Sequence, residues 1–105
     1  KKYMDKIDHI ALQVNDIKES VEYYTSNYDC SIIFKDDYWA FLQFDNIKLA
    51  LIIEDQHPHH IGFAVDELEC IDHITEHRDG SWSKYVQDPS GNNIEIISYK
   101  KDKGN

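Results

Sequence analysis

Three residues of this sequence could together bind a metal ion: His9, His60 and Glu95. Each histidine opens a stretch of alternating apolar residues, and the two stretches, His9–Asn15 and His60–Asp66, align without a gap. Because side chains alternate between the faces of a strand, each histidine is predicted on the face opposite to the bulky apolar residues. Glu95 interrupts an apolar strand, where a buried carboxylate without a partner would be costly. Two imidazoles and one carboxylate form a facial triad that leaves positions on the metal open for a substrate.

Simpler interpretations exist for each of these residues taken alone. A single histidine near the start of a strand is usually exposed or hydrogen-bonded, and the glutamate could lie on an exposed edge strand. The equivalent positions of the two histidines favour the metal site. His57 and His59 precede the second strand and are predicted as loop residues. His73 and His77 are spaced for one face of a helix, which is predicted to be solvated.

Composition limits the classes of partner. The chain has 105 residues, of which 41% are hydrophobic, and this predicts a single domain, 1–105. A net charge of -9 without a basic cluster argues against nucleic acids and acidic membranes. Cys30 and Cys70 have no CxxC spacing and are interpreted as reduced thiols. The sequence has no apolar run of membrane-spanning length and no signal-peptide core at its start, so the cytoplasm is the predicted location.

The first predicted unit, residues 6–53, consists of a strand, a helix and three further strands. Lys6–Val14 alternates as a strand, and Asp16 is the predicted N-cap of the helix, with Glu19 at the capping-box position. Apolar residues at helical spacing form a stripe that covers the first strand: Ile17, Val21, Tyr24 and Tyr28. Turn residues then separate three strands of a meander: Cys30–Lys35, Trp39–Phe44 and Ile47–Ile53.

The second predicted unit, residues 59–99, repeats this order in a shorter form. The strand His60–Val65 is followed by a helix that is predicted to run from Asp66 or Glu67 to about His77. Two more strands complete it: Ser81–Gln87 and Asn92–Tyr99. One of the three expected strands is therefore missing or vestigial.

These residues carry a resemblance to a known family. The stretch Ile7–Asp16, the later His60–Phe63 and the stretch Tyr85–Ile96 resemble the vicinal oxygen chelate superfamily, and the turn Asp88-Pro89-x-Gly91 followed by Glu95 is the most specific part. The superfamily includes glyoxalase I, extradiol dioxygenases, methylmalonyl-CoA epimerase, fosfomycin-resistance enzymes and metal-free bleomycin-binding proteins.

The resemblance implies an α+β fold in which two βαβββ modules, the second one shortened, form a cupped, mixed β-sheet with the helices outside. It also implies that His9, His60 and Glu95 are the ligands of one divalent metal ion, such as iron, manganese, zinc or nickel. Members with four ligands place another polar ligand in the last strand of the first module. Here the equivalent residue is Lys48 or Ala50, depending on register, and neither can serve as that ligand.

The alternation of side chains also predicts which residues line the site. Lys48 and Tyr85 are the candidate catalytic groups, and Tyr85 coincides with a metal-site tyrosine of the fosfomycin group, although packing against aromatic neighbours is an equal alternative. The predicted substrate-binding residues are Trp39, Phe41, Gln43 and Ser83. Such a lining suits a small oxygenated or aromatic ligand that chelates the metal through two oxygens.

The expected function is that of a metal-dependent enzyme, with lyase or isomerase, dioxygenase and resistance-type transferase activities all open. The alternative is a non-catalytic protein that binds an antibiotic or metabolite, as bleomycin-resistance proteins do. A homodimer is also predicted, because the shortened unit would expose a sheet edge. By resemblance, His9 of one subunit is expected to meet His60 and Glu95 of its partner.

Overall fold

The computed structural model describes residues 4–53, 58–65, 75–76 and 82–99 of the chain. The chain divides into two compact units. The first unit is His9–His60, and the second unit combines Lys1–Asp8 with Ile61–Asn105.

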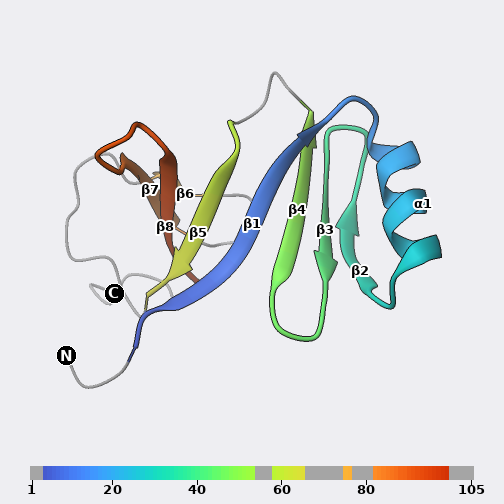
Figure 1. Ribbon diagram of the computed structural model, residues 1–105, viewed down its shortest axis with the longest axis horizontal. Coiled ribbons are helices and arrows are strands. Elements are labelled where there is room, and N and C mark those ends of the chain that lie inside the picture. Colours follow the sequence, from blue (N-terminus) through green and yellow to red (C-terminus); the bar gives the residue numbers. More distant parts are fainter. Residues whose placement is uncertain (1–3, 54–57, 66–74, 77–81, 100–105) are drawn as a thin grey trace. The chain divides into compact units, whose positions relative to one another are not determined.

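The first unit contains one helix and a mixed sheet (Figure 1). Most of β1 (Lys6–Val14) lies in this unit and is followed by α1 (Ile17–Asn27) and a meander of three strands, namely β2 (Ser31–Lys35), β3 (Trp39–Gln43) and β4 (Lys48–Ile53). The strand order is β2-β3-β4-β1, in which β1 is parallel to β4 and the other pairs are antiparallel. This is the predicted order of a strand, a helix and three strands.

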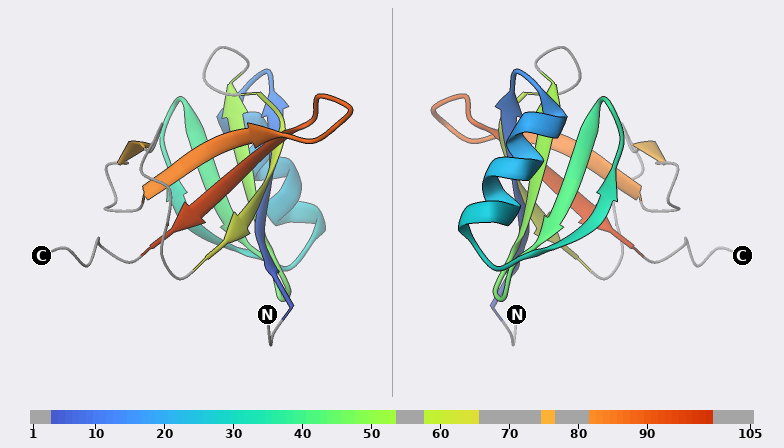
Figure 2. Two further views of the ribbon diagram at one scale, coloured as in Figure 1. Left: turned by 90° about the vertical axis from the view of Figure 1, so that its left-hand side faces the viewer. Right: turned by 90° about the vertical axis from the view of Figure 1, so that its right-hand side faces the viewer.

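Helix α1 begins and ends where its capping residues place it. The Asp16 carboxylate accepts a hydrogen bond of 2.8 Å from the Glu19 N–H, as an N-cap does. At the other end the Tyr28 N–H donates to the Tyr24 carbonyl. Ile17 and Val21 are buried against one face of the sheet, which α1 covers (Figure 2). The described part of the chain has no helix that is long and apolar enough to cross a membrane.

The two faces of the first unit's sheet differ in character. The face beneath α1 carries the larger core, where Ala40, Leu42 and Leu51 pack with the helix. The opposite face, called the His9 face below, has small buried residues covered by aromatic ones. Strand register places on it His9, Ala11 and Gln13 from β1, Trp39, Phe41 and Gln43 from β3, and Lys48, Ala50 and Ile52 from β4.

The strands of the second unit pair in the same order as those of the first unit. It contains β5 (His60–Ala64) apart from His60 itself, β6 (Thr75–Glu76), β7 (Trp82–Gln87) and β8 (Asn93–Ser98). The strand order is β5-β8-β7-β6, in which β5 is parallel to β8 and the other pairs are antiparallel. The α+β class with mixed strands, as predicted, is therefore confirmed.

Strand β6 corrects one boundary that the sequence predicted. The second helix was expected to run to about His77, but Thr75–Glu76 is extended and pairs with Trp82 and Ser83 of β7. The β-branched Thr75 favours an extended backbone, and pairing with β7 outweighs the helical spacing. The prediction of a vestigial strand is confirmed by these two residues, while 66–74 lie outside the described residues.

A tight turn between β7 and β8 fixes their register. The Asp88 carboxylate accepts hydrogen bonds of 2.9 Å from the N–H groups of Ser90 and Asn92, and Gly91 adopts a positive φ of 87°. The Asn92 side-chain amide donates a further hydrogen bond of 2.9 Å to this carboxylate. That bond is the largest cause of the lowered pKa of Asp88, and the backbone bonds lower the pKa further. The resulting register places Tyr85 opposite Glu95.

Candidate metal centre

The two histidines that the sequence predicted as ligands lie beside each other in the first unit. His9 of β1 is 4% exposed, and His60, the first residue of β5, is 8% exposed. Their Nε2 atoms are 3.3 Å apart, and their rings meet edge to face at a centroid distance of 5.3 Å. The structure thus places His9 next to His60 of the same chain.

The tautomer of His60 follows from its backbone contact. Its Nδ1 atom lies 2.9 Å from the carbonyl oxygen of Pro58, and a carbonyl can only accept a hydrogen bond. Nδ1 of His60 therefore carries a proton, and in the neutral ring Nε2 keeps its lone pair. This lone pair is on the side of the ring that faces His9, which is the arrangement found in metal-ligating histidines.

His59 has a different role from its neighbour. It is exposed, and its Nδ1 atom accepts a hydrogen bond of 3.2 Å from the Gln13 N–H, so it ties its own segment to β1. This agrees with its prediction as a loop residue. The predictions for His57, His73 and His77 concern positions outside the described residues.

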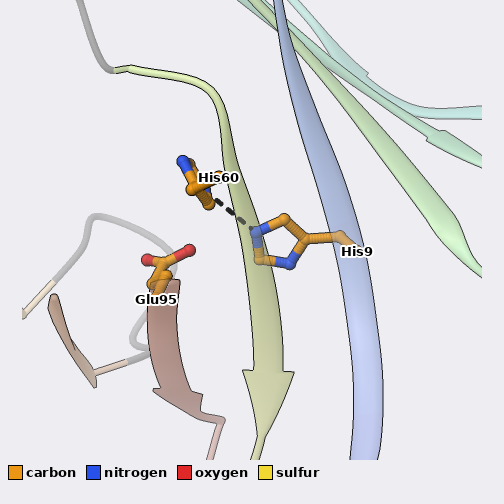
Figure 3. Close-up of side chains that lie close together, drawn as sticks. All are labelled: His9, His60 and Glu95. Atoms are coloured by element: carbon orange, nitrogen blue, oxygen red, sulfur yellow. Dashed lines mark hydrogen bonds between the residues drawn. The ribbon is translucent and has the colours of Figure 1, made fainter. Parts of the chain in front are cut away.

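The third candidate ligand, Glu95, lies in the middle of β8 and is only 5% exposed. Its register partner on β5 is Gly62, two residues after His60, so Glu95 and His60 project from the same side of these strands. The ligand atoms of His9, His60 and Glu95 all lie within 4.8 Å of one another. Figure 3 shows the two imidazoles and the carboxylate directed toward one another.

This group of atoms fits a divalent metal ion. Two nitrogens at right angles on an ion, each at about 2.1 Å, would be about 3.0 Å apart, close to the distance between the two Nε2 atoms. All three side chains are buried, and imidazole nitrogens and carboxylate oxygens are common ligands of divalent metal ions. The chain therefore has a group that could bind one metal ion.

Strand register identifies the position that corresponds to Glu95 in the first unit. In the second unit Gly62 pairs with Glu95, and in the first unit Ala11, the counterpart of Gly62, pairs with Ala50. Ala50 is therefore the equivalent of Glu95, and the choice between Lys48 and Ala50 is resolved. A methyl group stands where a fourth ligand would be, whereas Lys48 is the register partner of His9.

Tyr85 and Ser83 of β7 lie on the same face of the sheet as Glu95 of β8. Tyr85 is the register partner of Glu95 and is 38% exposed. Burial raises the pKa of Tyr85, and the negative charge of Glu95 raises it further, so the phenol stays protonated at neutral pH. Ser83 is opposite Ile97 and is fully buried.

The predicted lining residues of the first unit lie next to His9. Phe41 meets the His9 ring edge to face at 5.7 Å, and Trp39 lies 5.5 Å from Phe41 between ring centroids. Nζ of Lys48 is 5.2 Å from the centre of the Phe41 ring. Gln43 is exposed, and its side chain donates a hydrogen bond of 2.6 Å to the Phe44 carbonyl.

The sequence alone did not identify Phe34, whose ring lies 4.9 Å from that of Trp39. Strict alternation from Ser31 would place Ile33 on the His9 face. The register of β2 shifts between Ile32 and Phe34, so that Phe34 pairs with Phe41 instead. Only a bulge signal could have shown this, and the short run has no glycine to mark one.

Comparison with known proteins defines the class of fold. No protein-family model matches the sequence, and no curated protein matches it. A hypothetical protein from Bacillus halodurans is similar in structure, with a TM-score of 0.77, 18% identity and coverage of 98% of this chain and 100% of that one. A methylmalonyl-CoA epimerase from Streptomyces coelicolor has a TM-score of 0.73 and 19% identity, over 91% of this chain and 98% of that one.

A glyoxalase/bleomycin resistance/dioxygenase superfamily member from Vibrio splendidus gives a TM-score of 0.65 at 15% identity, over 90% of this chain and 98% of that one. The resemblance that the sequence motifs indicated is thus confirmed for the fold: the chain has the fold of the vicinal oxygen chelate superfamily.

Proposed function

We propose that this protein is a divalent-metal-dependent enzyme that acts on a small oxygenated substrate able to chelate the metal. The observation that carries the proposal is the buried pair of imidazole nitrogens 3.3 Å apart, with the Glu95 carboxylate in the same group.

The number of ligands favours a catalytic role over a structural one. Structural zinc sites are closed by four protein ligands, whereas catalytic sites keep at least one open position. Among the described residues the candidate ligands are three, His9, His60 and Glu95, and the position equivalent to Glu95 in the first unit is Ala50, which has no donor atom. The site is therefore expected to accept ligand atoms from a substrate.

The residues around the group have separate parts in this proposal. A bound divalent ion supplies Lewis-acid chemistry, which polarises a substrate oxygen and stabilises negative charge on it. The Pro58 carbonyl keeps the proton of His60 on Nδ1 and so directs Nε2 to the metal. Tyr85, with its raised pKa, is suited to donate a hydrogen bond to an anionic oxygen rather than to act as a base. Lys48, the register partner of His9, is proposed as a cation near the substrate oxygens. Lyase or isomerase, dioxygenase and transferase reactions are all compatible with these parts.

The proposal includes a homodimer in a reducing compartment such as the cytoplasm. Cys30 is a free thiol among the described residues. Strand β6 pairs, in the described residues, only with Trp82 and Ser83 of β7, so most of the outer edge of β7 is not covered by it. Sheet edges of this kind are often protected by association with a second copy. Sedimentation at micromolar concentration tests this, and a monomer in both the metal-free and the metal-loaded forms would contradict it.

Elemental analysis of protein purified without chelator tests the metal centre. We expect about one divalent ion per chain. His60→Ala and Glu95→Gln should each lose most of the metal while they keep the circular dichroism of the parent. His59→Ala is the matched control, because it removes an adjacent imidazole that is exposed and lies outside the group. If His60→Ala and Glu95→Gln retain as much metal as His59→Ala does, the proposed centre is wrong.

A metal-free protein that nevertheless binds bleomycin or a related antibiotic without turnover would support the alternative function, that of a non-catalytic binding protein.

A further inference from the structure

Aromatic side chains form a continuous row on the His9 face, beginning at the candidate metal ligand. The Phe41 ring lies 5.7 Å from the His9 ring, the Trp39 ring 5.5 Å from Phe41, and the Phe34 ring 4.9 Å from Trp39. These separations fall in the range in which aromatic rings attract each other. Phe34, Trp39 and Phe41 are called the aromatic row below.

The two strands next to the aromatic row, β4 and β1, carry small residues on the His9 face. Phe41 is the register partner of Ala50, which in turn pairs with Ala11, and both alanines are buried. Small residues at these positions allow the rings to lie close to the sheet. Burial decreases along the row, from His9, which is 4% exposed, to Phe34 on the outer strand, which is 38% exposed. The row therefore connects a buried histidine with a solvent-exposed aromatic surface.

A positive charge accompanies the buried end of this row. Lys48 is the register partner of His9, and its Nζ atom lies 5.2 Å from the centre of the Phe41 ring, within the range of a cation–π contact. The whole protein has a net charge of -9, which repels anions at long range. A lysine at this position offsets that repulsion locally, where an anionic group would approach the metal.

We propose that the site selects an aromatic oxyacid: a ligand whose oxygens bind the metal, whose negative charge is balanced by Lys48, and whose ring stacks on the aromatic row. This inference rests on the proposed function for the metal-binding end of the ligand only. The stacking surface and Lys48 belong to the protein itself, so their part can be measured with and without a metal.

Two probes with the same chelating group separate the contribution of the aromatic ring from that of metal chelation. Benzohydroxamate carries a ring and acetohydroxamate carries a methyl group, and both are anionic when they chelate. In cobalt-substituted protein, followed by its visible spectrum, benzohydroxamate should bind about tenfold more tightly, as expected for one ring contact. Trp39→Leu and Phe34→Leu should bring this ratio close to one and leave the affinity for acetohydroxamate unchanged.

The two remaining variants complete the design. Lys48→Met keeps the alkyl chain and removes the charge, so it should weaken both probes by a similar factor and preserve the ratio. Tyr23→Leu is the matched control for loss of an aromatic ring, because Tyr23 is exposed on α1 and its ring meets that of Tyr24 edge to face. It should change neither affinity. Metal content must equal that of the parent in every variant.

A metal-free measurement distinguishes failure of this inference from failure of the proposed function. 4-Nitrobenzoate should quench tryptophan fluorescence of the metal-free protein, and Trp39→Leu should abolish the saturable part. If no metal binds but this quenching is seen, the metal centre is wrong and the aromatic oxyacid surface stands. If metal binds but both hydroxamates bind equally, or the row variants keep the tenfold ratio, the inference is overturned and the metal centre stands.

Discussion

Replacing Ala50 by glutamate tests whether the two units build one site from equivalent positions. Ala50 is the counterpart of Glu95, since both pair with the residue two positions after a candidate histidine ligand. Ala50→Glu therefore adds a carboxylate where a fourth ligand would stand. Lys48 lies on the same face of β4 in both the metal-free and the metal-loaded protein, so if the metal centre is correct, metal binding gives the new carboxylate an additional cation.

The magnitude follows from the burial of this position. Ala50 is 6% exposed and packs beneath Trp39 and Phe41. A larger side chain there costs about 1–3 kcal/mol through overpacking. An unpaired buried carboxylate costs about 3–5 kcal/mol more, or else is neutralised by protonation. Because a domain of this kind is stable by about 5–15 kcal/mol, the metal-free variant should be close to unfolding.

Urea unfolding with chelator and with excess metal measures the effect. The matched control is Ala50→Gln, which has the same size as glutamate but no charge. With chelator, the glutamate variant should be the less stable of the two at neutral pH. With metal it should recover more free energy of unfolding than the glutamine variant does. Equal responses of the two variants to metal would refute the assignment of Ala50 as the equivalent of Glu95.

Three further predictions concern single residues. Asp16→Ala should reduce the free energy of unfolding by about 0.5–2 kcal/mol, because α1 loses its N-cap, while Asp16→Asn should cost much less; urea titration checks both. Because the pKa of Asp88 is lower in the folded protein than in the unfolded chain, its ionised carboxylate stabilises the fold at pH values above its ordinary pKa, and this stability is lost as pH falls through the pKa of the folded state. Asp88→Asn should therefore flatten the decline of stability below about pH 4, which urea titrations at stepped pH measure. Because the pKa of Tyr85 is higher in the folded protein than in the unfolded chain, the protein loses stability as pH rises beyond about 10, where the unfolded chain ionises first. The parent should therefore lose more stability than Tyr85→Phe in that range, and ultraviolet titration should show one late-ionising tyrosine fewer in the variant.

Local patterns in the sequence predicted most of the first unit. Asp16 begins α1, and the alternation of β1 placed His9 opposite to the apolar residues that face the helix. These features depend on neighbours within a few residues, which a sequence displays directly. Phe34 was missed because a bulge, stabilised by pairing with β3, reverses the alternation of β2. Thr75–Glu76 was predicted as helical but is extended, because it pairs with β7.

Register was the other limit of sequence reasoning at the site. The sequence showed that a ligand was lacking in β4 but left Lys48 and Ala50 as alternatives, because a shift of two residues preserves the face and only strand pairing distinguishes them. The observed strand pairing assigns different roles to Lys48 and Ala50. Ala50, equivalent to Glu95, removes a ligand from the repeat, whereas Lys48 adds a charge next to His9. The two units have thus diverged at one pair of strands, one retaining a carboxylate beside Tyr85 and the other a lysine beside Phe41. Under the proposed function this divergence separates metal binding, which needs Glu95, from selection of the ligand, which depends on Lys48 and the aromatic row.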